Sequence, residues 1–422
     1  MDPTPPPGSP LVVDASLRLI VPPRAAWAVD SVHWLAWEGA ASDATVQWSA
    51  DRVTWTKAIR EPATRYEQGT DLRFRWQVPF AIEKSLALRL VVEGRASETV
   101  TIDVVPSQKR NYTLERKTEA AGFVWRDGPT LAPIGSSMRL VGGWNPTMFR
   151  GPDDFFTTTS EVWSTNDGVK WGLASVAPWE PRHTFGSATL GGRFYILGGD
   201  ALHGHYQTDV WSTANGDDWW RETPTAPWGN RILPIAFSHD NALWIMGGQT
   251  IPEEVDDRDP LVIYDDVWRS ADGVEWKRVL EHAPWPPRGA VLGSASFEKA
   301  MWILGGGTYS SVRAARKVLA DVWSSGDGVT WTAHETPPWV AREYHNVAVF
   351  DGRLWLLAGY APLDGSDLDD VWYTADGDNW YPQSSGVLPA RHAGAAAVTS
   401  DALWITAGSG GDTGVYWLTR AP

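Results

Sequence analysis

The chain has 422 residues and a net charge of −15, from 36 Lys and Arg against 51 Asp and Glu. No apolar run approaches the roughly 18 residues that a membrane-spanning helix needs, and the acidic balance disfavours binding to nucleic acid or anionic lipid. The chain has no Cys, which excludes disulfides, thiolate metal ligands, Cys nucleophiles and a Tyr–Cys cofactor. Its 28 Trp suggest a repeated structural device.

Residues 1–9 are expected to form a Pro-rich linker. The first ten residues read MDPTPPPGSP, which is too polar for the core of a signal peptide and too rich in Pro for a helix. Such a spacer often follows an export or lipid-attachment signal. We therefore expect an extracellular, periplasmic or cell-surface protein whose signal is not visible in this sequence, and whether a signal or lipid anchor preceded Met1 stays open.

Residues 10–106 are expected to form a β-sandwich. Short alternating segments typical of strands lie at 17–20, 33–37, 45–49, 72–76, 86–92 and 99–104. The run VQWSADRVTW, followed by FRWQVP and LALRLVVEGRASETVTIDVV, resembles the immunoglobulin-like or fibronectin-like modules of bacterial surface proteins. The resemblance implies a domain that acts as a spacer.

Residues 109–422 contain six copies of one repeat. Each copy has an apolar segment that ends in Gly-Gly or Ala-Gly, namely RLVGG, YILGG, WIMGG, WILGG, WLLAG and WITAG. Successive copies are 49 to 58 residues apart, which suits one propeller blade. A DVW-like segment follows, and in five copies Asp-Gly or Asn-Gly then leads into a further Trp-bearing segment. Because these dipeptides tolerate the positive φ of tight hairpins, we expect each copy to be a four-stranded antiparallel blade.

These features resemble the kelch repeat, in which an Arg stands at the start of the first strand, a glycine pair ends the second, an Asp-Val-Trp-like segment forms the third, and Trp marks the fourth. The resemblance implies an all-β fold: a six-bladed kelch-type β-propeller preceded by the β-sandwich. The first blade lacks the Arg, and residues 123–127 are expected to be its innermost strand. The last copy ends without a fourth strand, so we expect residues 111–118 to supply it and close the ring.

The mouth of the central channel is the default place for a site, because the connections between blades meet there. Five arginines occupy equivalent positions in these connections and would form a partial ring, open at the first blade: Arg182, Arg231, Arg288, Arg342 and Arg391. Such a ring would suit the carboxylate or phosphate of a small acidic ligand. Alternatively, each Arg belongs to the repeat and pairs with loop carbonyls or with the Asp of a neighbouring DVW strand.

Four tryptophans flank the arginines and could bind the apolar face of a sugar: Trp179, Trp228, Trp285 and Trp339. The alternative for them is packing between blades. Weak candidates for acid–base chemistry, as in sugar isomerisation, are His183, Glu343, His345 and His392, which lie just after the Arg positions. For these histidines the alternative is a structural role in the repeat.

Three connections are longer than the rest, at residues 144–159, 251–265 and 310–320. Long non-repeating loops on a repeat scaffold usually carry specificity, so we expect them to wall one side of the channel mouth. Acidic stretches such as 251–260 could hold Ca²⁺, but none matches a twelve-residue calcium loop. We expect no metal site and no cofactor.

Two classes of function remain. The first is a non-catalytic recognition protein that binds a glycan, an anionic small ligand or a protein at the channel mouth. The alternative is a kelch-fold enzyme resembling the sialic-acid mutarotases, which share six blades and an Arg-lined channel. Recognition is favoured because no nucleophile, metal cluster or cofactor motif emerges. The expected partners are thus a glycan, an acidic small molecule or a protein, with no nucleic acid and no membrane span, and the expected state is a monomer.

Overall fold

The computed structural model describes residues 11–21, 26–39, 44–58, 73–80, 82–145, 147, 157–202, 205–251, 261–290, 294–309, 315–362, 365–383, 386 and 388–421. These residues are almost entirely in strands and turns, with a 3-10 turn at Ser409–Gly411. Within the described ranges, no helix has the length and apolarity to cross a membrane. The chain divides into two compact units, and each is described separately.

The first unit comprises Met1–Arg110, Glu335–Val340 and Thr374–Pro382. Its strands are β1 (Val12–Val13), β2 (Arg18–Ile20), β3 (Ala26–Ala28), β4 (Val32–Glu38), β5 (Thr45–Ser49), β6 (Thr56–Lys57), β7 (Arg73–Gln77), β8 (Ser85–Val92), β9 (Arg95–Ala96), β10 (Val100–Val105) and β33 (Trp380–Pro382).

One group of strands in this unit runs β1-β9-β8-β10-β3, with β5 beside β8 and β6 beside β5, and a second places β4 between β2 and β7. Alternating residues of both groups enter a single core, as shown by Leu35 of β4 and Leu88 of β8, which are both fully buried. Asn379 is far from these strands in the sequence but belongs to this unit. Its Oδ1 accepts a hydrogen bond from the backbone N–H of Ala28 at 2.8 Å.

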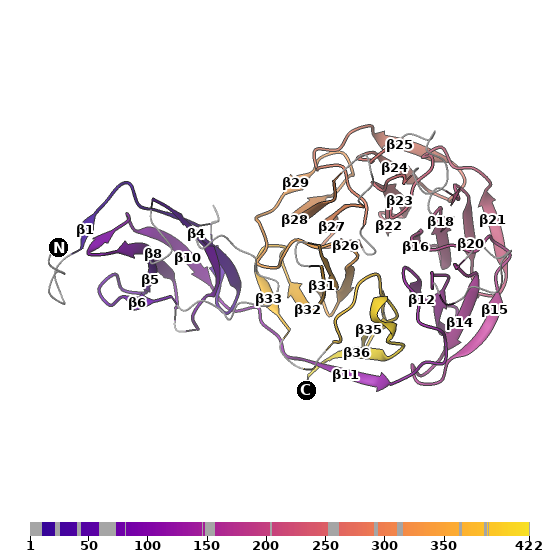
Figure 1. Ribbon diagram of the computed structural model, residues 1–422, viewed down its shortest axis with the longest axis horizontal. Helices are drawn as coiled ribbons and strands as arrows, with labels where there is room; N and C mark the ends of the chain where they lie inside the picture. Colours follow the sequence, from indigo (N-terminus) through magenta and orange to yellow (C-terminus); the bar gives the residue numbers. More distant parts are fainter. Residues whose placement is uncertain are drawn as a thin grey trace. The chain divides into compact units, whose positions relative to one another are not determined.

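The second unit has a β-propeller arrangement (Figure 1). Four of its four-stranded sheets follow one another along the chain: β12 (Thr130–Ile134) to β15 (Gly172–Val176); β16 (Gly186–Leu190), β17 (Arg193–Leu197), β20 (Val210–Thr213) and β21 (Trp219–Thr223), with a separate two-stranded sheet of β18 (Asp200–Leu202) and β19 (His205–Tyr206) between β17 and β20; β22 (Ile235–His239) to β25 (Trp276–Leu280); and β26 (Ala295–Phe297) to β29 (Thr332–Ala333). Between the end strands lie β13 (Ser137–Val141), β14 (Glu161–Thr165), β23 (Ala242–Met246), β24 (Val267–Ser270), β27 (Ala300–Thr308) and β28 (Lys317–Ser325). The first strand of each sheet lies nearest the centre (Figure 1).

A fifth four-stranded sheet combines the two ends of this unit. It has the order β11-β36-β35-β34, with β11 at Tyr112–Thr118, β34 at Ala395–Val398, β35 at Leu403–Thr406 and β36 at Val415–Arg420. Strands β11 and β36 are antiparallel, with Leu114 opposite Leu418. This pairing confirms that the segment at 111–118 supplies the missing outer strand. Strands β30 (Asn346–Phe350), β31 (Arg353–Ala361) and β32 (Ser366–Thr374) come after the β26–β29 sheet in the chain.

The expected innermost strand of the first sheet was placed wrongly. That strand is β12, which starts at Thr130, whereas residues 123–127 form the connection before it. The sequence there reads FVWR, whereas the connections between blades in other copies read PWxxR. Residues 123–127 were therefore not recognised from the sequence as one of these connections. Phe123 is buried against Trp171 of the same sheet, with ring centroids 5.3 Å apart at a nearly perpendicular angle. It therefore stands where the other copies have Trp.

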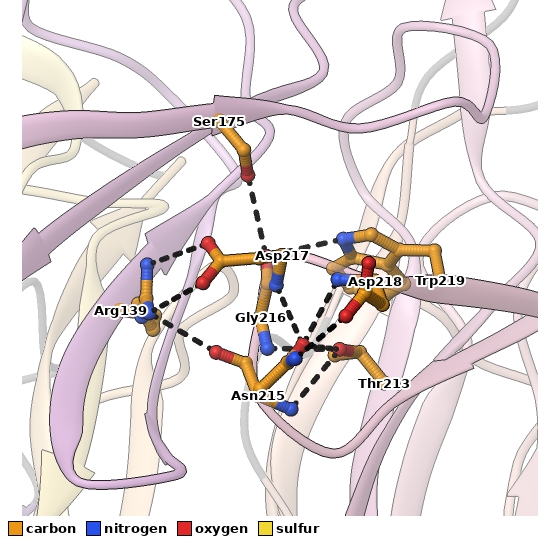
Figure 2. Close-up of polar contacts among 8 residues, drawn as sticks. All are labelled: Arg139, Ser175, Thr213, Asn215, Gly216, Asp217, Asp218 and Trp219. Atoms are coloured by element: carbon orange, nitrogen blue, oxygen red, sulfur yellow. Dashed lines mark hydrogen bonds and ion pairs between the residues drawn. The ribbon is translucent and has the colours of Figure 1, made fainter.

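The Asp-Gly and Asn-Gly turns contact the neighbouring sheet, as the turn before β21 shows. In the turn before β21, Asn215 Oδ1 accepts the backbone N–H groups of Asp217 and Asp218, both at 2.9 Å (Figure 2). Gly216 has a φ of +84°, the left-handed conformation that glycine adopts without strain. Arg139 of the preceding sheet donates to the Asn215 carbonyl oxygen at 3.0 Å and pairs with Asp217 (Figure 2). The repeated motif thus forms both the hairpin and a contact between blades.

Candidate functional site

The five predicted arginines are buried and hydrogen-bonded within their own sheets. Each guanidinium donates to the carbonyl of the first residue of its glycine pair, as in Arg182 to Gly198 at 3.0 Å. Each also pairs with a carboxylate, at 2.5 to 2.7 Å: Arg182 with Asp209, Arg231 with Asp266, Arg288 with Asp321, Arg342 with Asp370, and Arg391 with Asp412. This geometry favours the structural interpretation of the arginines.

The arginine ring is not open at the first blade. Arg126 is fully buried, donates to the Gly142 carbonyl at 3.2 Å and pairs with Glu161 at 3.0 Å. It occupies the position of Arg182 in the next sheet, with Glu161 in place of Asp209. The first copy therefore has the Arg that the sequence comparison missed, because the Trp that marks the motif is replaced by Phe123.

The four predicted tryptophans are also buried, with exposed fractions of 1 to 2%. Trp179, Trp228 and Trp285 lie in hydrophobic clusters that combine residues of two adjacent sheets. Each packs edge-on against a Trp of a fourth strand, as in Trp179 against Trp219 at 5.6 Å between ring centroids. Trp339 belongs to the first unit, where it packs against Trp380 at 5.8 Å. This placement favours packing over sugar binding for all four.

The residues one and two positions after each Arg surround the centre of the second unit. At the residue two positions after each Arg, the backbone N–H donates a hydrogen bond to the carbonyl oxygen of the equivalent residue in the preceding sheet. The described links are Thr184 to Gly128, Leu233 to Thr184, Tyr344 to Ala290, Ala393 to Tyr344 and Gly128 to Ala393. All six of these residues have φ between +50° and +58°, a strained conformation for Thr, Leu and Tyr that the ring of bonds maintains. The ring brings the preceding residues together, and these include Asp127, His183, Glu343 and His392.

A polar cluster results, which we call the mouth cluster: Asp127, His183, Asp200, Arg316, Glu343, Tyr344, Asp367 and His392. Below the ring lies a cavity of about 140 Å³, lined among others by Thr130, Ser187, Ser294 and Asn346. These four residues come from four different inner strands or the segments just before them. The mouth cluster therefore lies at one end of the central channel.

His183 forms an ion pair with Asp200, with Nδ1 and Oδ1 2.9 Å apart. Burial alone would lower the pKa of His183, but the Asp200 carboxylate, helped by Asp127, outweighs it and the pKa is raised. Thr184 Oγ1 donates to the same carboxylate at 2.8 Å, and the Trp144 indole stacks near the imidazole at 6.3 Å. This histidine is consequently fixed in orientation and biased towards its charged form.

His392 lies between two carboxylates. Its Nδ1 lies 2.6 Å from Asp367 Oδ1, and its Nε2 lies 3.9 Å from Asp127 Oδ2. Burial would lower the pKa of His392, but the hydrogen bond with Asp367 and the charge of Asp127 raise it. Ser409 Oγ donates to Asp367 at 2.6 Å, which holds the carboxylate in place. The arrangement orients Nε2 towards Asp127 at a distance longer than a direct hydrogen bond.

Glu343 is a fully buried carboxyl group that pairs with Arg316. Arg316 Nε lies 2.5 Å from Glu343 Oε1 and Arg316 Nη2 lies 3.4 Å from the Tyr344 hydroxyl. Burial raises the pKa of Glu343 to about 7, and the Arg316 cation opposes that rise. Glu343 is thus poised between its neutral and charged forms near neutral pH.

His345 does not belong to the mouth cluster. It is fully buried, and its Nε2 lies 2.8 Å from the Leu304 carbonyl oxygen. Burial, with the nearby Arg342 cation, lowers its pKa to about 3. His345 is therefore a neutral packing residue in this structure, whereas His183, Glu343 and His392 are brought together.

Sequence reasoning missed the partners of these three residues. Asp127 would have been found by aligning the copies one position past the Arg, once Arg126 was recognised. Asp200 directly follows a glycine pair, so it also has a periodic position. Arg316 and Asp367 lie in connections that break the repeat and had no such signal. Much of the three long connections, at residues 148–156, 252–260 and 310–314, falls outside the described residues, so their role in specificity stays a prediction.

The fold and the site define an all-β protein with a β-propeller arrangement and a polar cluster at one end of its channel. No family model matches the chain, and no curated protein matches it. Among solved structures it is similar to one described as "Structure of YjhT", with a TM-score of 0.53 and 15% sequence identity, over 70% of this chain and 94% of that one. At this identity the likeness supports the propeller fold.

Proposed function

We propose that the propeller has six kelch-type blades and that strands β30, β31 and β32 belong to the fifth along the chain, before the blade that β11 completes. Their copy of the repeat has the Arg, the Ala-Gly ending and the DVW segment that characterise the repeat. We also propose that the first unit contains a β-sandwich that acts as a spacer, since two groups of strands share its core. Export to the cell surface or beyond fits this modular organisation.

We propose that the protein is a non-catalytic recognition protein that binds a glycan at the mouth cluster. The observation that carries this proposal is the pair of oriented histidines, His183 and His392, each held by a carboxylate and each beside aromatic rings. Sugar hydroxyls need donors and acceptors in fixed directions, and aromatic faces bind the apolar side of a sugar ring.

The charge of the mouth cluster favours a neutral glycan over an anionic ligand. Asp127, Asp200, Glu343 and Asp367 oppose Arg316, His183 and His392, and the predicted arginine ring is already paired with its own carboxylates. A ligand carboxylate or phosphate would meet these acidic groups, whereas hydroxyl groups can donate to them. We therefore place the neutral glycan ahead of the acidic small molecule predicted from the arginines.

Binding to a glycan array, followed by isothermal titration calorimetry, tests this proposal. Replacing His392 by Gln should weaken glycan binding at least tenfold, because the oriented Nε2 is lost, while the melting temperature stays close to that of wild type. His282→Gln is the matched control, since His282 is exposed and pairs with Asp265 away from the cluster. The proposal fails if no glycan binds the wild-type protein, or if both variants bind as well as wild type.

The geometry of His392 favours one second candidate, an acid–base activity on a sugar such as mutarotation or isomerisation. Asp367 holds Nδ1, which leaves Nε2 to exchange a proton with a ligand hydroxyl. Following anomer exchange by NMR with reducing sugars separates the two functions. Faster exchange that disappears in His392→Gln supports the enzyme, and binding without faster exchange supports recognition.

A further inference from the structure

Arg316 lies in a pocket made of one carboxylate and three aromatic rings. Its guanidinium carbon lies 5.0 Å from the ring centroid of Tyr360, 5.6 Å from that of Tyr309 and 5.7 Å from that of Tyr344. Glu343 Oε1 forms the base of this pocket. A guanidinium surrounded by tyrosines and paired with a carboxylate is a typical arrangement for recognition of a cationic group.

The pocket has unused capacity for hydrogen bonding. Glu343 is fully buried, yet its Oε2 has no hydrogen-bond partner among the described residues. A buried carboxylate oxygen without a donor costs free energy, and a second N–H of a better-placed guanidinium would remove that cost. Arg316 contacts the carboxylate through Nε alone, so it does not use the two-pronged geometry that guanidinium and carboxylate can adopt.

Arg316 differs from the buried arginines of the repeat in a way that makes it replaceable. Arg182 is fully buried and makes two bonds to Asp209 plus two to the backbone carbonyls of Glu180 and Gly198. The Arg316 side chain is 25% exposed and lies just before β28, in a connection that is not part of the blade repeat. Removing it therefore disturbs no strand pairing.

We propose that this pocket is a binding site for an arginine side chain of a partner protein, and that the chain's own Arg316 occupies it in the absence of the partner. The site goes beyond the glycan proposal and does not depend on it. The partner's guanidinium would bind Glu343 through both carboxylate oxygens and lie among Tyr309, Tyr344 and Tyr360. The carboxylates near the pocket suit a cation, since Asp127 acts electrostatically on Tyr344 and Asp367 balances the charge of His392, which packs against Tyr344.

The test uses Nα-acetyl-arginine amide as the probe and the full chain as the protein, by calorimetry at pH 8 and again at a higher pH, because loss of the Arg316 cation raises the pKa of Glu343 further. Arg316→Ala vacates the pocket, so it should bind the probe at least tenfold more tightly than wild type. The double variant Arg316→Ala/Glu343→Gln should lose this gain, because the neutral amide cannot form the charged pair. Arg278→Ala, which removes an exposed arginine paired with Glu281, should behave like wild type.

Two further measurements keep the test decisive. Nα-acetyl-lysine amide should bind Arg316→Ala more weakly than the arginine probe, since an ammonium cannot bridge both carboxylate oxygens. If Arg316→Ala folds poorly, Arg316→Gln is used, and the probe should raise its melting temperature but not that of Arg316→Gln/Glu343→Gln. Equal binding of the probe to wild type and Arg316→Ala, or unchanged binding when Glu343 is replaced, would overturn the proposal. The pocket shares Arg316, Glu343 and Tyr344 with the mouth cluster, so glycan binding is measured separately, with His392→Gln in the otherwise wild-type chain.

Discussion

Arg182 and Asp209 form a buried ion pair within one sheet, with Nη1 and Oδ1 2.6 Å apart and Nη2 and Oδ2 3.3 Å apart. The Arg182 side chain is fully buried and that of Asp209 is 16% exposed. The pair joins the connection before β16 to the start of β20. Five further Arg–carboxylate pairs occupy the equivalent positions in the other copies of the repeat, so the same interaction stabilises each copy.

Replacing Asp209 by Ala should destabilise the protein by roughly 3–5 kcal/mol, because it leaves a buried guanidinium without its counter-charge. Urea unfolding followed by Trp fluorescence measures the change. Glu281→Ala is the control, because the pair of Glu281 with Arg278 is exposed and should contribute about 1 kcal/mol or less. Equal losses in the two variants would contradict a special role for the buried pair.

The turn glycines should differ in their tolerance to Ala according to what their Cβ would meet. Gly328 has a φ of +73°, and an added Cβ would overlap the ring of Trp244 in the preceding sheet, so Gly328→Ala should cost roughly 2–4 kcal/mol from backbone strain and overpacking. Gly352 has a φ of +64° with nothing within 4 Å of the added atom.

Gly352→Ala should therefore cost only about 1 kcal/mol, the strain of the backbone alone. Calorimetric melting of both variants tests the difference. A loss for Gly328→Ala no larger than that for Gly352→Ala would show that the turn moves away from Trp244 without penalty.

Trp285 should behave as a core residue. It is 1% exposed and packs edge-on against Trp331 at 5.9 Å. Trp285→Ala should cost roughly 3–5 kcal/mol, the usual loss for a buried aromatic side chain. Trp220→Ala, at a 49% exposed position, should cost less than about 1 kcal/mol. A Trp285→Phe variant that stays stable but loses glycan affinity would indicate that Trp285 contacts the ligand.

His345 should make the protein less stable in acid. Its pKa in the folded state is lowered to about 3 by burial and by Arg342, against an ordinary value of 6.5. As the pH falls below 6.5, the unfolded state gains a proton that the folded state does not, so stability is lost between pH 6.5 and pH 3. His345→Gln should show a smaller fall in melting temperature from pH 7 to pH 4.5 than wild type.

Glu343 changes stability with pH in the opposite direction to His345. Because its pKa is raised from 4.5 to about 7, Glu343 stabilises the folded state below about pH 4.5. This contribution is lost as the pH rises to about 7. It is present in wild type and in His345→Gln alike, so it cancels in the comparison. His282→Gln should instead show a slightly larger fall in melting temperature than wild type, because the hydrogen bond with Asp265 raises the pKa of His282 and the variant loses that contribution in acid. Identical slopes in wild type and His345→Gln would show that His345 takes up its proton without unfolding.

The repeat, the hairpin turns and the closing strand β11 could be predicted because they depend on local order in the sequence. Alternation of apolar residues specifies a strand, and Asn215-Gly216 or Asp327-Gly328 specifies a tight turn, through interactions within a few residues. Strand β11 was predicted from the similar spacing between residues 111–118 and the first glycine pair and between the fourth-strand Trp and the glycine pair of later copies. The innermost strand of the first blade was misplaced because Phe123 replaces the Trp that marks the other copies.

The sequence by itself determined that arginines recur at one place in each blade, but only the tertiary structure decided what they contact. Whether Arg182 reaches a ligand or Asp209 depends on the distance between strands that are far apart in the chain. The mouth cluster depends on the tertiary structure even more strongly. Asp127 and His392 come from opposite ends of the repeat region, and Arg316 reaches Glu343 from a connection that follows no repeat. Such contacts have no local pattern, because closure of the ring brings their residues together.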